Sequence, residues 1–350
     1  MHHVFRSLQK ELKHHLSTEL KHSAILYLPN FKGGKKMIWL IGCKGMLGSE
    51  VARQLEQNKY HWVGTDKEVD ITDREALSSF EKSVETSSYL DTTSTDKHIK
   101  WIINCSAYTN VDKAEEEPEL ADKLNNIGAL NIARTARSIG AKLIHISTDY
   151  VFNGKGNEPY TEDMEKVPLG VYGRTKSAGE EAIQKEMTQF YILRTAWLYG
   201  FDGKNFVYTM TKLMNSQDQI NVINDQTGTP TCAVELAATI LKIIEKSDNA
   251  TEAFGKHSAP AFGIYHFTNG GQTNWFEFAQ EIYKFGKKYG KITQNCQINP
   301  CTTAEYGTQA ERPAYSVLSK DKICKELKIK LPTWQSCLEK FIKSERFDIT

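Results

Sequence analysis

A tyrosine and a lysine four residues apart, Tyr172 and Lys176, are the side chains of this sequence best suited to chemistry. Residues at this spacing on a helix share one face, so the phenol and the ammonium can point into one pocket. A nearby cation favours the phenolate and makes the phenol a better proton donor to a developing alkoxide. The hydroxyl of Thr148 ends the apolar run that precedes this pair. The three residues fit a carbonyl reduction in which a nicotinamide cofactor supplies hydride and the protein supplies a proton.

The spacing alone is not specific, because it occurs twice more in the chain. Tyr208/Lys212 and Tyr283/Lys287 have the same separation, and we interpret both pairs as ordinary helix surface. The context of Tyr172 distinguishes it from them. It follows a series of alternating strand and helix patterns that begins with a glycine-rich loop.

That loop follows the apolar run at 37–41, which has the pattern of a strand buried on both faces of a parallel sheet. The loop, G-C-K-G-M-L-G at 42–48, leads into a helical pattern, and its spacing is G-x-x-G-x-x-G instead of the commoner G-x-G-x-x-G. Glycines there allow a tight turn and a close approach to pyrophosphate at the helix N-terminus. A second strand at 60–65 ends at Asp66, which we expect to accept hydrogen bonds from the adenosine ribose.

Further strands at 101–105 and 142–147 alternate with helices at about 70–83 and 126–139. Loops at the carboxyl ends of such strands line the ligand crevice, so we expect the loop after the third strand, at 106–109, to border the cofactor. Residues 85–98 are polar and turn-rich and are predicted to be a surface insertion. The alternation predicts an α/β protein with a Rossmann-type doubly wound parallel sheet and a smaller C-terminal α/β substrate domain.

Composition excludes several other classes of protein. The 350 residues carry a net charge of +1, which offers no basic surface for nucleic acid or for a membrane. No apolar run approaches the roughly 18 residues of a membrane span. The seven cysteines are scattered and contain no C-x-x-C pair, so we expect free thiols and a cytoplasmic location. The histidines show no ligand spacing, and no metal site is predicted.

Residues 1–36 differ from the rest of the chain. They are polar and rich in histidine and lysine, and their apolar run at 24–28 is too short for a signal peptide. The segment ends in K-G-G-K-K directly before Met37, and K-G-G is what a purine-rich ribosome-binding site would encode if it were translated. We expect Met37 to be the natural start, with no packed element before it. A native disordered or helical extension is the alternative.

Longer motifs make the prediction more specific. The chain contains G-C-K-G-M-L-G, N-C-S-A-Y-T-N-V-D-K-A-E, H-I-S-T-D-Y-V-F-N-G, V-Y-G-R-T-K-S-A-G-E, L-R-T-A-W-L-Y-G, N-D-Q-T-G-T-P-T and E-R-P-A-Y-S-V-L. In combination they resemble the bacterial dTDP-4-dehydrorhamnose reductases, which are extended short-chain dehydrogenases/reductases. The resemblance covers residues 37 to about 342. Gly170 stands where the family often has Asn, and residues 1–36 and 85–98 are extra.

The resemblance implies roles for individual residues. Thr148, Tyr172 and Lys176 are the expected catalytic residues: Tyr172 donates the proton, Lys176 contacts the nicotinamide ribose and lowers the pKa of Tyr172, and Thr148 hydrogen-bonds the substrate oxygen. The expected cofactor-binding residues are Gly42, Cys43, Lys44, Gly45, Met46, Leu47, Gly48, Asp66, Asp70, Ile71, Ser106, Ala107, Tyr108 and Lys176. The expected substrate-binding residues are Thr109, Asp149, Trp197, Asn205, Pro230, Thr231 and Arg312. A buried core Trp197 and a surface Arg312 are the alternatives for those two.

The implied activity is reduction of the 4-keto group of dTDP-4-dehydro-L-rhamnose by NADPH or NADH. Asp66 and Lys67 favour opposite cofactors, so we expect both to be used. Two alternatives stay open: a reductase of another nucleotide-linked 4-ketosugar, and a non-catalytic relative similar to the regulatory beta subunit of methionine adenosyltransferase. The intact catalytic residues argue against the second. A homodimer also stays open.

The expected domain division follows the same resemblance. An NAD(P)-binding domain spans 37–200, with the helix at 232–246 returning to it, and a sugar-nucleotide domain comprises 201–231 and 247–350.

Overall fold

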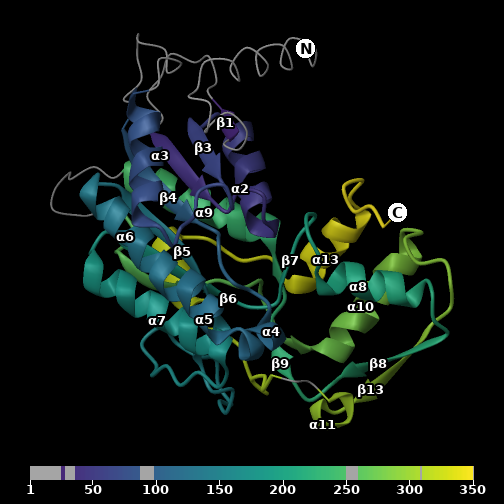
Figure 1. Ribbon diagram of the computed structural model, residues 1–350. Helices are drawn as coiled ribbons and strands as arrows, with labels where there is room; N and C mark the ends of the chain where they lie inside the picture. Colours follow the sequence, from purple (N-terminus) through teal and green to yellow (C-terminus); the bar gives the residue numbers. More distant parts are fainter. Residues whose placement is uncertain (1–24, 28–35, 87–97, 250–258, 308–309, 350) are drawn as a thin grey trace.

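A parallel sheet of six strands, extended by one short antiparallel strand, forms the centre of the protein (Figure 1). The computed structural model describes residues 25–27, 36–86, 98–249, 259–307 and 310–349. The strands, in spatial order, are β1 (Ile25–Tyr27), β3 (Trp62–Thr65), β2 (Met37–Ile41), β4 (Ile99–Asn104), β5 (Lys142–Thr148), β6 (Phe190–Thr195) and β11 (Gly263–His266). Neighbours from β3 to β11 are parallel. The predicted Rossmann-type fold class is confirmed.

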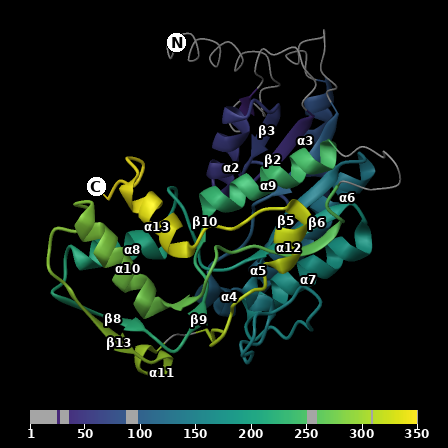
Figure 2. The ribbon, with the colours of Figure 1, turned by 180° about the vertical axis from the view of Figure 1, so that it is seen from behind.

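Helices cover both faces of this sheet (Figures 1 and 2). On one face lie α2 (Met46–Gln57), α9 (Ala233–Asp248) and α12 (Asp321–Leu327), and on the other lie α3 (Arg74–Thr86), α6 (Gly128–Ser138) and α7 (Val171–Glu186). Strand β2 serves both layers, because Ile38 and Leu40 pack on the first face whereas Met37, Trp39 and Ile41 pack on the second. A strand buried on both faces needs a continuous apolar run, which is the pattern read from the sequence.

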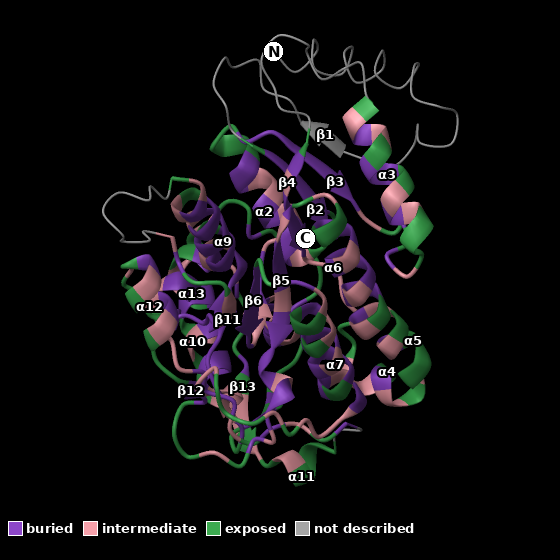
Figure 3. Ribbon diagram, turned by 90° about the vertical axis from the view of Figure 1, so that its left-hand side faces the viewer, coloured by how far each residue is buried: buried purple, intermediate pink, exposed green. Residues whose placement is uncertain are grey.

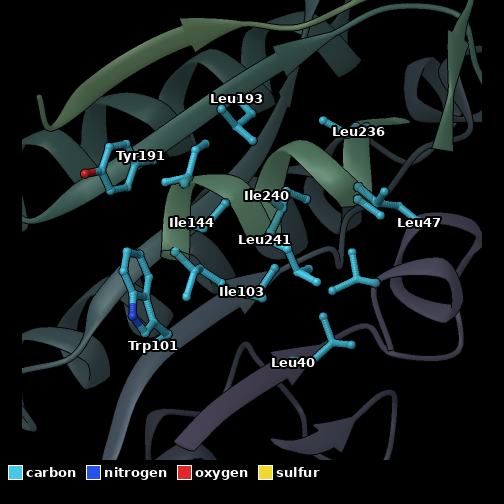
Figure 4. Close-up of a cluster of buried hydrophobic side chains, with 14 of the residues drawn as sticks. Leu40, Leu47, Trp101, Ile103, Ile144, Tyr191, Leu193, Leu236, Ile240 and Leu241 are labelled. Atoms are coloured by element: carbon cyan, nitrogen blue, oxygen red, sulfur yellow. The ribbon is translucent and has the colours of Figure 1, made fainter. Parts of the chain in front are cut away.

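The core beneath α9 shows how the first layer is held. Figure 4 shows apolar side chains of α9 directed at the sheet, among them Leu236, Ile240 and Leu241 opposite Ile103, Ile144 and Leu193. Each of the three sheet residues is completely buried. Figure 3 shows the same arrangement for the whole protein, with buried strands between helices whose outer faces are exposed.

A smaller lobe follows β6 and lies beside the sheet (Figure 1). Its helices are α8 (Phe206–Met214), α10 (Trp275–Lys288), α11 (Thr303–Tyr306) and α13 (Trp334–Lys343). Three two-stranded sheets join them: β7 (Leu198–Tyr199) with β10 (Thr231–Cys232), β9 (Thr227–Gly228) with β12 (Thr273–Asn274), and β8 (Gln219–Ile223) with β13 (Gln297–Cys301). Aromatic side chains form its core; Tyr199, for example, packs edge-on against Phe341.

The structure corrects two expectations about organisation. An element does precede Met37, because Ile25–Tyr27 forms β1 against the edge strand β3. Residues 263–266, expected in the second domain, form β11 and pair with β6 at the other end of the central sheet. In both cases a short segment satisfies the exposed hydrogen-bonding groups of an edge strand, which local sequence does not reveal. Residues 87–97 of the expected insertion lie outside the described residues, and α3 continues to Thr86 before them.

Within the described part of the chain, no helix is both long and apolar enough to cross a membrane.

A buried ion pair attaches α7 to the sheet. Arg194 of β6 donates from Nε and Nη2 to the two carboxylate oxygens of Glu180 of α7, at 2.9 and 2.8 Å. Both side chains are at most 1% exposed. The Ser147 hydroxyl of β5 donates to the same carboxylate at 2.6 Å, and Lys166 lies 3.6 Å from it. The contact therefore links one helix to two adjacent strands.

Breaking this pair should destabilise the protein strongly. Arg194→Met leaves the Glu180 carboxylate buried without its main partner, so we expect the free energy of unfolding to fall by about 3–5 kcal/mol. Urea denaturation at pH 7 measures the change. Lys284→Met is the matched control, because it breaks an exposed pair with Glu281 within α10 and should change the value by about 0–1 kcal/mol. Equal effects of the two variants would contradict the prediction.

Candidate active site

A cavity of about 900 Å³ lies at the carboxyl ends of the central strands. Its walls are the segments that follow β2, β3, β4, β5 and β6, the start of α7, and Lys204 and Trp275 from the smaller lobe. In a doubly wound sheet this edge, where the strand order reverses, is the ligand-binding crevice. The two expected catalytic residues of α7, Tyr172 and Lys176, both line the cavity, as does Thr148.

The glycine-rich loop brings the N-terminus of α2 to this cavity. Gly42 has a φ of +77°, and its N–H and that of Cys43 both donate to Thr65 O, at 2.7 and 3.0 Å. A Cβ on Gly48 would lie 1.9 Å from Gly42 O, so only glycine allows the helix to start this close to the loop. Gly45 is the N-cap of α2. Free N–H groups at a helix N-terminus favour an anion such as a phosphate.

Asp66 closes the other side of the loop. Its Oδ2 accepts from the Lys44 N–H at 3.1 Å and its Oδ1 from the Lys67 N–H at 2.9 Å. Glu68 accepts from the Asp66 N–H at 2.8 Å and from the Lys44 ammonium at 3.1 Å. The Asp66 carboxylate is therefore held in place at the cavity wall, where its remaining lone pairs can accept from a ribose hydroxyl. Lys67 also lines the cavity and offers a cation beside it.

The start of α7 orients the tyrosine and the lysine. The helix begins at Val171, whose N–H donates to the Glu115 carboxylate at 2.7 Å, so Tyr172 stands in its first turn. One turn later, Lys176 extends into the sheet and donates to Ile146 O at 2.6 Å. The side chain of Lys176 is only 2% exposed.

A π-helical segment supports α7 from outside. Residues Lys123–Ile127 form a π-helix between α5 (Pro118–Asp122) and α6, and buried Asn125 lies within it. Asn125 accepts from the Tyr108 N–H at 2.9 Å and donates to Tyr108 O and to the Thr175 hydroxyl, both at 3.1 Å. A Cβ on Gly179 would lie 2.1 Å from Asn125 O. The π-helical segment thus couples the loop after β4 to the helix that carries Tyr172.

Burial dominates the electrostatics of the catalytic candidates. It raises the pKa of Tyr172 to about 12, with the Asp149 charge acting in the same direction and a hydrogen bond with Thr148 opposing both. It also lowers the pKa of Lys176 to about 8, although Glu180 and Cys105 act in the opposite direction. In the ligand-free protein, burial therefore outweighs the lowering of the Tyr172 pKa that is expected from Lys176, because desolvation disfavours both charged forms.

Asp149 is a further buried titratable group of the cavity. The Thr148 hydroxyl donates to its Oδ1 at 3.0 Å, while Oδ2 has no hydrogen-bond partner among the described residues. Burial raises the pKa of this carboxyl to about 6. A buried acceptor without a partner is costly unless a ligand supplies one, so Oδ2 is suited to a substrate hydroxyl.

Two stacked tryptophans form the wall on the side of the smaller lobe. The rings of Trp197 and Trp275 lie 3.6 Å apart and nearly parallel, at 11°. Trp197 has a φ of +47°, which costs a residue of this size about 1–3 kcal/mol and is typical of functional sites. A Cβ on Gly228 would lie 2.6 Å from its ring, so this glycine provides the space. Both indoles line the cavity.

The structure brings most of the predicted residues together at the cavity. Those that line it are Gly42, Gly45, Met46, Leu47, Asp66, Asp70, Ile71, Ser106, Ala107, Thr109, Thr148, Asp149, Tyr172, Lys176 and Trp197. Cys43, Lys44, Gly48, Tyr108, Asn205, Pro230, Thr231 and Arg312 are not among the lining residues. Cys43 belongs to the apolar core, and the Tyr108 hydroxyl donates to Glu117 at 2.8 Å.

Two of the predicted substrate ligands have other partners. The Asn205 side chain caps α8: its Oδ1 accepts from the Val207 and Tyr208 N–H groups, and its Nδ2 donates to Gly200 O. Arg312 donates from Nη2 to Asp112 at 2.7 Å, which links its loop to α4 (Val111–Glu116). Asparagine is a preferred N-cap residue, so a helix that starts at residue 206 could have indicated the capping role of Asn205.

Tyr150, Lys204 and Trp275 also line the cavity, although none of them was predicted from the sequence as a site residue. Trp275 starts a helix far along the chain, and only its stacking on Trp197 brings it there. Lys204 lies in a glycine-containing turn, and neighbouring Gly203 approaches Met46 of the glycine-rich loop. A lysine in such a turn was the one feature of the sequence that could have indicated a place for Lys204 at the site. Among the described residues, no group of acidic, histidine and cysteine side chains is placed to hold a metal ion.

Comparison with known proteins agrees with this arrangement. A family model described as the RmlD substrate binding domain matches residues 36–347. The chain belongs to this family. The spore coat polysaccharide biosynthesis protein SpsK of Bacillus subtilis is 36% identical over 311 residues, covering 87% of this chain and 96% of that protein. The dTDP-4-dehydrorhamnose reductase of Salmonella typhimurium is 38% identical over 249 residues, covering 71% and 80%. The resemblance inferred from the motifs is confirmed.

A solved structure extends the similarity to three dimensions. The dTDP-4-dehydrorhamnose reductase of Bacillus anthracis, crystallised in complex with NADP, shares 34% identity with a TM-score of 0.76. The alignment covers 88% of this chain and 98% of that one. Membership of the family therefore includes the fold of both lobes.

The buried carboxylate of Asp149 should lower stability above pH 6. Its folded pKa of about 6 exceeds the usual 3.8, so the unfolded chain loses this proton first and stability falls as pH rises from about 4 to 6. Asp149→Asn lacks this loss, and we expect it to be more stable than the wild type by about 2–3 kcal/mol at pH 7. Urea denaturation at pH 4 and pH 7 measures the effect. An advantage of equal size at both pH values would refute the assignment.

Proposed function

We propose that this protein is a dTDP-4-dehydrorhamnose reductase that converts dTDP-4-dehydro-L-rhamnose to dTDP-L-rhamnose with NADPH or NADH. The observation that carries the proposal is one cavity bounded by Thr148, Tyr172 and Lys176 and by the N-terminus of α2. Relatives of this name share 34–38% identity with the chain. The reduction of a ketone needs both a dinucleotide site and a proton donor, and the cavity offers the two together.

The residues present fit a nicotinamide dinucleotide. The backbone of the loop at 42–48 and the start of α2 would hold its diphosphate, and Asp66 would accept from the adenosine ribose. Lys176 has an N–H available for the nicotinamide ribose. When bound, the cofactor supplies hydride to the substrate carbonyl carbon. Asp66 favours a free ribose hydroxyl whereas Lys67 favours a 2′-phosphate, which supports use of both cofactors.

The proposed chemistry at the substrate uses the hydroxyl groups of Thr148 and Tyr172 and the carboxylate of Asp149. The Thr148 hydroxyl and the Tyr172 phenol would hold the ketone oxygen, and the Tyr172 proton passes to that oxygen as it gains negative charge. Burial keeps Tyr172 protonated until then, because it raises the phenol pKa. Asp149 Oδ2 would accept from a neighbouring sugar hydroxyl, and Trp197 would cover the apolar face of the hexose.

The protein divides into two units, with residues 263–266 in the first and not in the second. We propose an NAD(P)-binding unit that includes the central sheet with β11 and α9, and a sugar-nucleotide unit built on α8, α10 and α13. A cytoplasmic location and a homodimer stay predictions from the sequence.

Removing the hydroxyl of Tyr172 should stop turnover without affecting cofactor binding. We expect Tyr172→Phe to lower kcat about 10²–10⁴-fold, because the alkoxide loses its proton source, while the Kd for NADPH stays unchanged. Single-turnover oxidation of NADPH with a panel of dTDP-4-ketosugars measures kcat and tests the function itself. Tyr283→Phe, in the pair Tyr283/Lys287, is the matched control and should have wild-type activity. Wild-type protein that binds NADPH but reduces none of the sugars would refute the proposed function.

Arg312 should act on the sugar nucleotide and not on the cofactor. A charge-assisted contact with the substrate diphosphate is worth about 1.5–3 kcal/mol, so Arg312→Ala should raise the KM for the sugar nucleotide about ten- to a hundredfold. The Kd for NADPH should not change. Asp112→Asn separates binding from loop anchoring, because it weakens the partner of Arg312 but keeps the guanidinium. If Arg312 contacts the substrate, Asp112→Asn should raise KM less than Arg312→Ala does. Equal increases in KM would mean that Arg312 acts by anchoring its loop.

A further inference from the structure

His145 of β5 lies against Lys176 inside the protein. The ring is 1% exposed, and its Nε2 is 3.3 Å from the lysine Nζ. On the other side, its Nδ1 is 3.0 Å from Nδ2 of Asn104, which ends β4 and is also 1% exposed. Burial is the main cause that holds the pKa of His145 well below its usual range, so the ring is neutral and has one N–H.

Asn104 determines which ring nitrogen carries that proton. Its Oδ1 accepts from the backbone N–H of Ser106 at 2.9 Å and from the Ser106 hydroxyl at 2.6 Å. A backbone N–H can only donate, so the amide oxygen faces Ser106 and the amide nitrogen faces His145. The amide nitrogen is also a donor, and therefore His145 Nδ1 must accept. The proton of the ring is then on Nε2, which points at Lys176.

A second buried histidine has the opposite arrangement beside a cation. His266 Nδ1 lies 3.1 Å from Tyr160 O, which can only accept, so the proton of this ring is on Nδ1. Its Nε2 is then a lone pair that accepts from Arg194 Nη1 at 3.3 Å. His266 thus offers an acceptor to its cation, whereas His145 offers a donor to Lys176. A hydrogen-bond donor can pair with the lone pair of an uncharged amine. It cannot pair with an ammonium, which has no lone pair.

We propose that His145, oriented by Asn104, is a positioning residue that favours the uncharged amine form of Lys176 in the protein without ligand. The amine lone pair accepts from His145 Nε2–H, one N–H donates to Ile146 O, and the second N–H stays free for a ligand hydroxyl. The inference deepens the proposed function, because it concerns the lysine assigned there to the cofactor ribose.

Among the other groups around Lys176, the Glu180 charge favours the ammonium, and burial outweighs it. Tyr172, one turn earlier on α7, is kept neutral by burial, and burial raises the pKa of Cys105 to about 12, so its thiol is neutral as well. Glu180, one turn later, has its carboxylate occupied by Arg194 and Ser147. Burial accordingly lowers the pKa of Lys176 to about 8.

The affinity for the cofactor should then depend on whether Lys176 is protonated. An ammonium makes stronger, charge-assisted hydrogen bonds to ribose hydroxyls than an amine does. Because the lowered pKa places protonation near neutral pH, affinity for NADPH should decrease as pH rises through about 8. An ordinary lysine, with a pKa of 10.5, would show no such change below pH 9.5.

Nuclear magnetic resonance of ¹³Cε-lysine-labelled protein tests the charge state directly, without cofactor. The Lys176 signal is identified by its absence in Lys176→Met. We expect it to titrate near pH 8 in the wild type and above pH 9 in His145→Leu, which removes the donor. His266→Leu is the matched control, a buried histidine beside a cation, and should leave the midpoint unchanged. If His145→Leu does not fold, His145→Gln replaces it, with the same upward shift expected because its amide can turn an oxygen to the lysine.

Three results would overturn the inference: a wild-type Lys176 that stays charged to pH 10, a midpoint unaffected by the His145 variant, or an equal shift in His266→Leu. Fluorescence titration with NADPH between pH 6 and 10 is the companion measurement. Wild-type protein that binds neither NADPH nor NADH would refute the proposed function while the lysine titration still decided the role of His145.

Discussion

The buried contact between Glu180 and Arg194 is the interaction on which the arrangement of the site depends. A carboxylate without solvent is tolerated only with good partners, and here two guanidinium N–H groups and the Ser147 hydroxyl supply them. These partners belong to β5 and β6, whereas Glu180 belongs to α7. The helix is therefore attached to the sheet one turn after Lys176. The same strands end in the residues that line the cavity, so the position of the helix and the shape of the cavity are set together.

Exclusion of water decides the charges of the site. Lys176 and Asp149 are buried and Tyr172 is partly buried, and each pKa moves in the direction that favours the neutral form. A lysine four residues from a tyrosine suggests an ammonium that lowers the phenol pKa, but this argument holds only when the lysine is charged. In the ligand-free protein, desolvation outweighs the attraction between the two groups. Hydrogen-bond donors such as His145 then become as important as nearby charges.

The smaller lobe completes the cavity through contacts that join distant parts of the chain. Trp275 at the start of α10 stacks on Trp197, which keeps a backbone conformation that few residues of its size adopt. Arg312 is paired with Asp112 of α4, so the loop near residue 312 is anchored to the larger lobe at the edge of the site. Both contacts constrain how a sugar nucleotide would enter between the lobes. The strain at Trp197 is consistent with a residue held for binding instead of stability.

The sequence by itself determined the class of fold, the family and most of the cavity wall. These depend on local patterns: continuous apolar runs for strands buried on both faces, glycines such as Gly48 where a Cβ cannot fit, and the helical spacing of Tyr172 and Lys176. The tertiary structure alone decided the edge strands, the place of Trp275 and the partner of Arg312. It also decided the charge of Lys176. The physical reason is the same throughout, because burial and contacts between residues far apart in the chain leave no mark in the residues next to them.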